Sequence, residues 1–308
     1  MRILVTGGAG FIGSHINVQA LEMGHEVVVI DNLSHGTRKN VPAGARFVYG
    51  DILSPESWVD QVGSVDAVIH LAAQISVAAS ESDPLTDLRL NLEGTLRMLA
   101  VAKTLGASQF RTASSAAVYG NVDQLPLRED GPAWPISFYG WSKYTAEQYV
   151  KHFADLNHMQ AIIFRLANVY GPRQRTQGEG GVVAVFCEAL ARNETVEIHG
   201  DGEQTRDFVY VGDVARAFLH RLADPGPVSV YNVSTQTRTS VRALFEMLAR
   251  AAGVSAQSYR VGAKRPGDIT DSLLSQHKAK LWGFEPITPL TDGLEATWHY
   301  FREKEAQR

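Results

Sequence analysis

Residues 5–13 read "VTGGAGFIG" and stand between an apolar strand pattern and a helical pattern. Gly8, Gly10 and Gly13 have the spacing G-x-G-x-x-G, and Gly7 comes directly before them. Glycines at this point permit a tight turn and let a pyrophosphate approach the amides that begin the helix. An ordinary glycine-rich turn is the alternative, but the strand and helix on either side favour a dinucleotide site.

Short apolar, β-branched runs alternate with helical patterns through the first half of the chain. We expect buried parallel strands at 2–6, 26–30, 46–50, 66–72, 109–114 and 161–171. Helical patterns lie between them, and the one at 83–106 carries a single apolar stripe of Leu85, Leu88, Leu92, Leu96 and Leu99. This alternation predicts an α/β fold with a doubly wound parallel (Rossmann) sheet.

Asp31 ends the second expected strand, 18 residues after Gly13. A carboxylate at that position accepts hydrogen bonds from an adenosine ribose and repels a 2′-phosphate, so the sequence predicts NAD rather than NADP as the cofactor. Capping of a loop is the alternative role for Asp31. Asp51 follows the third expected strand and could reach the adenine edge.

Residues 138–143 read "FYGWSK" and place Tyr139 and Lys143 four positions apart. On a helix this spacing puts both side chains on one face. A cation beside a phenol favours the phenolate and lowers the pKa of the tyrosine, which would make Tyr139 a usable base near neutral pH. The spacing alone can arise by chance, so its meaning depends on the rest of the chain.

The amino-acid composition changes after about residue 172, because the segment 171–181 is polar and rich in glycine. We expect an NAD-binding domain at 1–173, to which 209–232 returns, and a smaller C-terminal α/β lobe at 174–308 that binds the substrate. In sheets of this kind the ligand lies at the carboxyl ends of the strands, where the second lobe should close over it.

Composition excludes several classes of function. With 29 basic and 33 acidic residues in 308, the net charge of −4 provides no basic field for nucleic acid. Cys187 is the only cysteine, which rules out an internal disulfide, fits a reducing compartment and suggests a small apolar helix residue. A strand pattern begins at residue 2, and no apolar run nears 18 residues, so we expect a cytoplasmic protein without a membrane segment or a metal site.

The chain resembles the extended short-chain dehydrogenase/reductases over nearly its whole length, and most of all their UDP-glucose 4-epimerase branch. The matching stretches are "VTGGAGFIGSH", "VVVIDNLSHG", "VIHLAAQISV", "NLEGT", "SSAAVYG", "FYGWSK", "FRLANVYGPRQ", "GDGEQTRDFVYVGDVARA", "YNVST" and "RPGDI".

The resemblance implies a role for individual residues. Phe11 and Ile12 would follow the diphosphate turn, and the adenosine half would be held by Asp31, Asn32, Asp51 and Ile52. The NAD cleft would be lined by Leu71, Ala72, Ala73 and Asn91. Ser115, Tyr139 and Lys143 would be catalytic, with Lys143 also bonding the nicotinamide ribose. The nucleotide diphosphate of the substrate would be held by Asn168, Arg206, Arg265 and Asp268, for which bidentate arginine is well suited.

Three positions concern the sugar lobe. His199 stands where relatives carry Phe or Tyr, so stacking on a uracil could be weaker or depend on pH. Ser275 replaces a common acid. Ser272 lies at the position that faces the sugar 2-substituent in relatives, where a small residue admits N-acetyl groups.

The resemblance implies 4-epimerisation of a UDP-hexose through a 4-keto intermediate. Related dehydratases and decarboxylases carry acidic residues where this chain has Ala116 and Ala117, which argues against those reactions. A UDP-glucuronate 4-epimerase remains an alternative, and a non-catalytic NAD-sensing protein is a remote one. Relatives pair the helices near 84–105 and 137–156 into a dimer interface, so we expect a homodimer. Packing within one protomer is the alternative.

Overall fold

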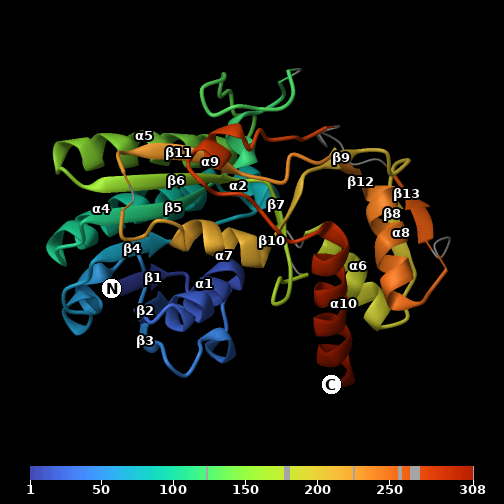
Figure 1. Ribbon diagram of the computed structural model, residues 1–308, viewed down its shortest axis with the longest axis horizontal. Helices are drawn as coiled ribbons and strands as arrows, with labels where there is room; N and C mark the ends of the chain where they lie inside the picture. Colours follow the sequence, from blue (N-terminus) through green and yellow to red (C-terminus); the bar gives the residue numbers. More distant parts are fainter. Residues whose placement is uncertain (123, 177–180, 225, 256–258, 264–270, 308) are drawn as a thin grey trace. The chain divides into compact units, whose positions relative to one another are not determined.

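The computed structural model describes residues 1–307 apart from 123, 177–180, 225, 256–258 and 264–270 (Figure 1). Two compact units are present. Unit 1 comprises Met1–Asn121, Glu129–Leu166 and Ala215–Asn232, and unit 2 comprises Val122–Arg128, Ala167–Val214 and Val233–Arg308. The main run of unit 1 therefore ends earlier than the predicted 173, and its returning segment begins later than 209.

A seven-stranded sheet with the order β11-β6-β5-β4-β1-β2-β3 forms the centre of unit 1. Its strands are β1 (Arg2–Thr6), β2 (Glu26–Asp31), β3 (Arg46–Tyr49), β4 (Ala67–His70), β5 (Gln109–Ser115), β6 (Gln160–Leu166) and β11 (Ser229–Val233). β1 to β6 pair in parallel, which confirms the predicted doubly wound α/β fold. The strand order reverses between β1 and β4, and sheets of this kind bind ligands beyond the strand ends at that point.

The helical segments of unit 1 connect these strands. They include α1 (Phe11–Glu22), α2 (Val77–Ser82), α3 (Pro84–Leu88), α4 (Gly94–Thr104) and α5 (Phe138–Leu156), the π-helical turn η4 (Arg89–Glu93), and the 3₁₀ turns η1 (Arg38–Asn40), η2 (Pro55–Ser57), η3 (Val59–Gln61) and η5 (Ala116–Val118). Helix α7 (Val211–Leu219) crosses from unit 2 back into unit 1.

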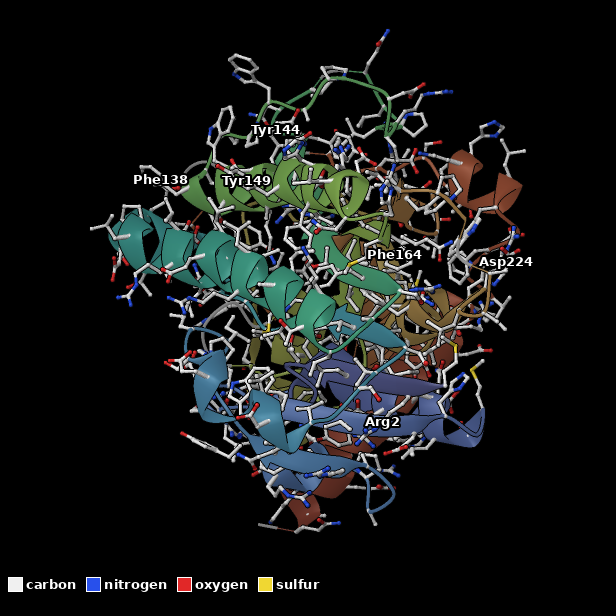
Figure 2. The ribbon with its side chains drawn as sticks, turned by 90° about the vertical axis from the view of Figure 1, so that its left-hand side faces the viewer. Arg2, Phe138, Tyr144, Tyr149, Phe164 and Asp224 are labelled. Carbon is white, nitrogen blue, oxygen red and sulfur yellow. The ribbon has the colours of Figure 1, made fainter. Side chains whose placement is uncertain are left out.

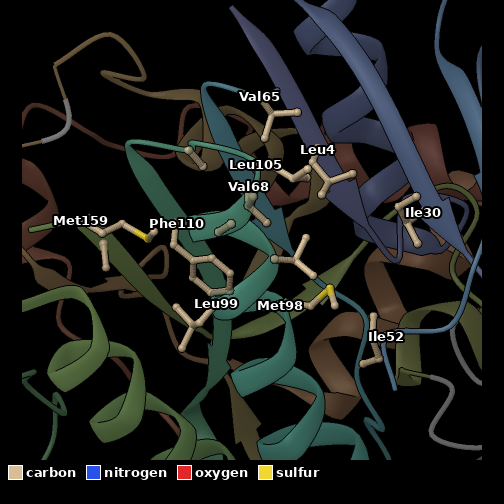
Figure 3. Close-up of a cluster of buried hydrophobic side chains, with 14 of the residues drawn as sticks. Leu4, Ile30, Ile52, Val65, Val68, Met98, Leu99, Leu105, Phe110 and Met159 are labelled. Atoms are coloured by element: carbon tan, nitrogen blue, oxygen red, sulfur yellow. The ribbon is translucent and has the colours of Figure 1, made fainter. Parts of the chain in front are cut away.

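The core of unit 1 lies between the sheet and the pair α4 and α5. Successive side chains of a strand point to opposite faces. Leu4, Val68 and Phe110 point to the α4 side and pack with Met98 (Figure 3). Val29 points to the opposite face, where it lies close to α1.

The segment expected as one helix at 83–106 is divided in the structure. α3 is followed by the π-helical turn η4 and then by α4. A π turn contains more residues than an α turn, so it rotates the apolar stripe out of line. Leu99 is fully buried, but Leu85 and Leu88 are 73% and 48% exposed. The apolar stripe predicted for 83–106 is therefore divided, and its N-terminal leucines are exposed.

Unit 2 is a smaller α/β unit with a core of its own. It contains β7 (Asn168–Tyr170), β8 (Val196–His199), β9 (Thr205–Arg206), β10 (Phe208–Tyr210), β12 (Thr239–Ser240), β13 (Tyr259–Gly262), α6 (Val182–Ala191), α8 (Val241–Ala252), α9 (His277–Leu281) and α10 (Leu290–Ala306). Phe186, Phe245 and Trp298 bring α6, α8 and α10 together. The strand predicted at 161–171 is in fact two strands: β6 stays in the large sheet, and β7 pairs with β10.

Within the described ranges, no helix combines the length and the apolar character that crossing a membrane requires.

Candidate active site

The glycine-rich turn after β1 is closed around Gly7. Gly7 has φ +69°, and a Cβ added there would lie 2.7 Å from the backbone nitrogen of Ala72. The left-handed residue of the turn is thus Gly7, and not Gly8, which instead packs against Val29. Only glycine fits at position 7, because any side chain would strike the chain that leaves β4. This contact joins the ends of β1 and β4 at the point where the strand order reverses.

The start of α1 presents an uncapped helix terminus beside this turn. Gly10 is the N-cap, and no side chain caps its helix. A Cβ at Gly10 would meet only the Gly7 carbonyl oxygen, at 3.1 Å, whereas one at Gly13 would lie 2.5 Å from that oxygen. Gly13 therefore lets α1 sit on the turn, and Gly10 keeps the approach to the first amides open. A diphosphate fits such a terminus, because the first N–H groups of a helix have no partner within it.

Asp31 holds a fixed carboxylate at the end of β2. Its Oδ2 accepts from the Ala9 amide at 2.9 Å, and its Oδ1 accepts from the Leu33 amide at 2.8 Å. Each carboxylate oxygen can accept a further bond, so the group can still receive two ribose hydroxyls. The glycine turn and Asp31 together fit NAD, and the negative charge disfavours a 2′-phosphate at the same place.

The other residues predicted to hold the adenosine, Asn32, Asp51 and Ile52, already make contacts within the protein. Asn32 Nδ2 donates to Asp51 Oδ2 at 3.0 Å, and the Leu53 amide donates to Asp51 Oδ1 at 2.8 Å. Ile52 is buried and lies so close to Gly94 of α4 that an added Cβ there would be 2.5 Å from Ile52 Cδ1. The Ile52 side chain thus belongs to the core, and only its backbone is left for a ligand.

Leu71, Ala72 and Ala73 leave β4 beside the glycine turn, where the Leu71 amide donates to the Thr6 carbonyl at 3.1 Å. Asn91, predicted to line the same cleft, is buried in η4. Its Nδ2 donates to Asp87 Oδ1 at 3.0 Å and to Ser142 Oγ at 3.1 Å. Both amide hydrogens are therefore used inside unit 1, and Asn91 ties η4 to α5.

The same network fixes the chain after β4. The Gln74 amide donates to Asn91 Oδ1, and Gln74 Nε2 donates to Asp87 Oδ1, both at 2.9 Å. Sequence reasoning did not identify Gln74, Asp87 or Ser142. Gln74 stands directly after the predicted residues 71–73, but no local pattern connects it with Asp87 or Ser142.

His70 closes a second chain of hydrogen bonds under this loop. Thr95 Oγ1 donates to the Asn91 carbonyl at 2.6 Å, so it can only accept from His70 Nε2, at 3.2 Å. His70 Nδ1 then accepts from Thr6 Oγ1 at 2.7 Å. Burial, with Lys143 nearby, lowers the pKa of His70 to about 3. A neutral His70 on β4 therefore bonds to β1 and α4, and through Thr95 to η4, and is not available as an acid.

The three predicted catalytic residues come from the end of β5 and the first turns of α5. Ser115 ends β5, and its Oγ accepts from the Ala117 amide at 3.2 Å. α5 begins at a cap in which Ser137 Oγ accepts from the Gly140 amide at 3.0 Å. A Cβ at Gly140 would lie 2.7 Å from the Ala117 carbonyl oxygen, so the start of α5 rests directly on the turn that follows Ser115. This packing brings the face of α5 that carries Tyr139 to the end of β5.

Tyr139 and Lys143 are both buried, each 9% exposed. Lys143 Nζ donates to the Ala113 carbonyl at 3.3 Å and lies 6.0 Å from the centre of the Tyr139 ring. Burial lowers the pKa of Lys143 to about 8, and the carboxylates of Asp87 and Glu147 oppose that decrease. The arrangement can supply an ammonium beside a phenol at the end of a strand.

The predicted substrate residues of unit 2 gather in part around 205–207. The Asn168 amide donates to the Asp207 carbonyl at 2.9 Å, and the Ser272 amide donates to the Thr205 carbonyl at 3.3 Å. Arg206 lies between these two attachments, on β9. Asn168, Arg206 and Ser272 are thus neighbours, whereas Arg265 and Asp268 lie outside the described residues.

Two further positions of unit 2 differ in setting. His199 ends β8, where its Nδ1 donates to the Ala263 carbonyl at 3.2 Å, with Glu197 Oε1 at 3.5 Å. Ser275 is buried, and its amide donates to the Leu127 carbonyl at 2.8 Å. Across the part of the chain that the structure covers, no three His, Cys, Asp or Glu residues are grouped as metal ligands.

Comparisons with known proteins identify the family of the chain. Residues 3–234 match the NAD dependent epimerase/dehydratase family. The chain is 42% identical to a UDP-glucose 4-epimerase from Thermotoga maritima solved with UDP-glucose, with a TM-score of 0.94 and 99% of each chain covered. It is 38% identical to the UDP-glucose 4-epimerase of Mycolicibacterium smegmatis over 99% of each protein.

The family also includes enzymes with other substrates and reactions. A UDP-N-acetylglucosamine 4-epimerase from Methanobrevibacter ruminantium, in complex with UDP-N-acetylmuramic acid, is 32% identical, with a TM-score of 0.92 and 98% of each chain covered. Relatives at 30% to 31% identity are UDP-glucuronic acid decarboxylases and a dTDP-glucose 4,6-dehydratase.

Proposed function

The chain belongs to the NAD-dependent epimerase/dehydratase family, and from that premise we propose that it is a 4-epimerase of UDP-hexoses. Its substrates would be UDP-glucose and UDP-galactose, interconverted through a 4-keto intermediate with NAD held in unit 1. Asn168, Arg206, Arg265 and Asp268 of unit 2 would bind the nucleotide diphosphate.

The proposal rests on the arrangement of residues at the end of β5. Ser115 is followed by Ala116 and Ala117, and α5 rests on that turn with Tyr139 and Lys143 on it. The set therefore has a base, an ammonium and a hydroxyl. It has no acidic residue at 116 or 117. Elimination would need such an acid, and the decarboxylase relatives keep a glutamate there. This supports epimerisation over dehydration or decarboxylation.

Each protein group has one task in the proposed reaction. Bound NAD supplies reversible two-electron oxidation at C4 of the sugar. Tyr139, as the phenolate, takes the proton of the 4-hydroxyl and returns it to the sugar oxygen once C4 has the opposite configuration. Lys143 keeps the phenolate favoured by its charge. Because Ser115 Oγ already accepts from the Ala117 amide, its own hydrogen is free to be donated to the sugar oxygen, which steadies the developing carbonyl.

A panel of UDP-sugars tests the proposal. Purified protein is given UDP-galactose, UDP-N-acetylgalactosamine or UDP-glucuronate, and the products are separated for 4-epimers. We expect UDP-glucose from UDP-galactose. Conversion of UDP-glucuronate alone would make the protein a UDP-glucuronate 4-epimerase, and no product from any sugar would favour a non-catalytic NAD-sensing protein.

A second part of the proposal concerns N-acetyl sugars. Ser272 is small and is attached beside Arg206, which is where a nucleotide sugar would be held. A tyrosine ring there would fill room that an N-acetyl group needs, and overpacking a tight site costs about 1–3 kcal/mol. The similarity to a UDP-N-acetylglucosamine 4-epimerase supports the idea.

Ser272→Tyr separates the two substrate classes. We expect it to lower the kcat/KM for UDP-N-acetylgalactosamine by roughly 5- to 150-fold and to leave UDP-galactose nearly unchanged. Equal losses on both sugars, or a wild type without N-acetyl activity, would show that Ser272 does not set this specificity.

We also propose a homodimer and a cytoplasmic role in galactose metabolism. The dimer is supported by exposed apolar side chains on two helices that pack against each other, α3 and α5. Phe138 and Tyr149 of α5 are 50% and 46% exposed (Figure 2). Exposed apolar side chains on neighbouring helices are typical of an interface between proteins.

A further inference from the structure

Glu147 is a buried carboxylate that neither the motifs nor the proposed chemistry uses. It is 2% exposed. Its Oε1 accepts from Ser114 Oγ at 2.5 Å and from Arg165 Nε at 2.9 Å, and its Oε2 accepts from Arg165 Nη2 at 2.7 Å. Paired bonds from one guanidinium fix both the distance and the orientation of the carboxylate. Arg165 is held in turn over the Tyr119 ring, with its Cζ 4.8 Å from the ring centre.

The position of Glu147 on α5 relates it to the catalytic residues. Tyr139, Lys143 and Glu147 follow one another at intervals of four, so they share one face of the helix. Lys143 bonds to the Ala113 carbonyl, and Glu147 bonds to Ser114. α5 is thus tied at two successive turns to the strand end that carries Ser115.

The second strand of this attachment is β6. Arg165 stands directly opposite Ser114 in the β5–β6 register. Glu147 therefore bonds to two adjacent strands at the same level of the sheet. A shift of α5 along the sheet would break three hydrogen bonds to a buried charge, which makes the register of the helix well defined.

Glu147 also acts on Lys143 through its charge. The other charged or titratable groups near Lys143 are Asp87 of α3, His70 of β4 and Tyr139 of its own helix. Burial lowers the pKa of Lys143 to about 8, and Asp87 and Glu147 oppose the decrease. Removing one of these carboxylates lets the ammonium lose its proton at lower pH.

We propose that Glu147 is a positioning residue for the catalytic set, which fixes α5 on β5 so that Tyr139 meets Ser115 and keeps Lys143 charged. This inference rests on the proposed 4-epimerase function. The two roles, reach and charge, can be separated by two substitutions.

Glu147→Asp keeps the charge but shortens the reach. We expect kcat for UDP-galactose to fall about 10- to 100-fold, as misplacement of a catalytic group by about 1 Å does, with KM within about twofold. The limbs of the pH–rate profile should stay where they are in the wild type, because the charge near Lys143 is unchanged.

Glu147→Gln keeps the size but removes the charge. Loss of a nearby negative charge favours the deprotonated forms of both Tyr139 and Lys143. The acid limb, where Tyr139 must ionise, and the alkaline limb, where Lys143 loses its proton, should both move to lower pH by roughly half a unit or more. A merely structural ion pair would leave both limbs in place.

Controls separate these effects from instability. Glu147→Gln leaves Arg165 without its counter-charge inside the protein, so Glu147→Gln/Arg165→Gln is made beside it and should shift the limbs in the same direction. Arg111→Met removes another buried arginine of the same unit, whose guanidinium bonds to the carbonyls of Phe218 and His220. It should lower the Tm without moving either limb.

The 4-epimerase activity of the wild type is measured before that of the variants. Wild-type activity, followed by Glu147→Asp with unchanged kcat or by both Gln variants with unmoved limbs, overturns the positioning role. A wild type without 4-epimerase activity overturns the proposed function instead. In that case the tyrosinate absorbance of each protein, minus that of its Tyr139→Phe counterpart, is titrated, and an identical midpoint with and without Glu147 overturns the inference.

Discussion

Lys143 keeps its charge in a place where charge is unfavourable. Its side chain is 9% exposed, and burial lowers its pKa to about 8. Near neutral pH the ammonium therefore persists, with Asp87 and Glu147 supporting it. The proposed chemistry depends on this residue, because a phenol loses its proton near neutral pH only beside such a charge.

Tyr139→Phe removes the proposed base and keeps the ring. We expect kcat to fall by about 100- to 10,000-fold, the usual contribution of a general base, while binding of UDP remains close to that of the wild type. Steady-state kinetics and calorimetric titration with UDP measure the two quantities. Retention of more than about half the wild-type rate would show that another group takes the proton.

Lys143→Met tests the charge itself. In the wild type the ammonium favours the phenolate, so the pKa of Tyr139 rises when the charge is lost and the acid limb of the pH–rate profile moves up. The alkaline limb set by Lys143, with its pKa of about 8, disappears at the same time. Both changes move the optimum to higher pH. An optimum that stays in place would mean that Lys143 does not set the ionisation of Tyr139.

At this scale, residues in contiguous motifs could be predicted from the sequence, and residues of the network behind them could not. Asp31 is indicated by its place at a strand end, 18 residues after Gly13, and the pair Tyr139 and Lys143 by its spacing along one helix. Gln74 and Asp87 meet only because α3 and the chain after β4 come together, so no local pattern connects them. The left-handed turn residue proved to be Gly7, since the contact that requires it is with Ala72, far away in sequence.

The start of α5 is the element on which the site depends most directly. Gly140→Ala would place a Cβ 2.7 Å from the Ala117 carbonyl oxygen and 3.0 Å from Pro135 Cβ. The carbonyl belongs to the backbone, so the helix must move away from the turn after Ser115. We expect kcat to fall about 10- to 100-fold, because small displacements of a catalytic group have effects of that size.

Gly44→Ala is the matched control for this substitution. Its Cβ would meet the flexible end of Leu21, at 3.3 Å, so the neighbour can give way. Kinetics and thermal unfolding of both variants should show an activity loss only in Gly140→Ala. Wild-type kcat in that variant would mean that the position of α5 on η5 is not critical.

The strands of the large sheet could be predicted from the sequence. Parallel strands that are buried on both faces consist of continuous runs of apolar, β-branched residues. β6 and β7 could not be separated in this way, since both are apolar and only their partners differ. The π-helical turn η4 was also invisible, because its residues fit an ordinary helical pattern. It is the reason why Leu85 faces outward and Leu99 inward.

On the scale of the whole molecule, a reaction without net redox change does not require the cofactor to exchange. We therefore expect NAD to co-purify with the protein and to be released on heating, and removal of NAD to lower the Tm, because a ligand stabilises the state that binds it. Enzymatic assay of the heated supernatant identifies the dinucleotide. NADP in that assay, or full turnover by protein free of cofactor, would contradict the role assigned to Asp31.

The exposed apolar side chains of unit 1 predict its association with a second copy. Leu85 on α3 is 73% exposed and Tyr149 on α5 is 46% exposed, and the two helices are neighbours. Burying such surface contributes about 25 cal/mol per Å², whereas a buried unpaired carboxylate opposes association. We expect a wild-type dimer in sedimentation equilibrium and a monomer for Leu85→Glu/Tyr149→Glu. Leu281→Glu, at a leucine 77% exposed on α9, is the matched control and should remain dimeric. A monomeric wild type, or a double variant that dimerises as tightly as the control, would mean that these helices are not the interface.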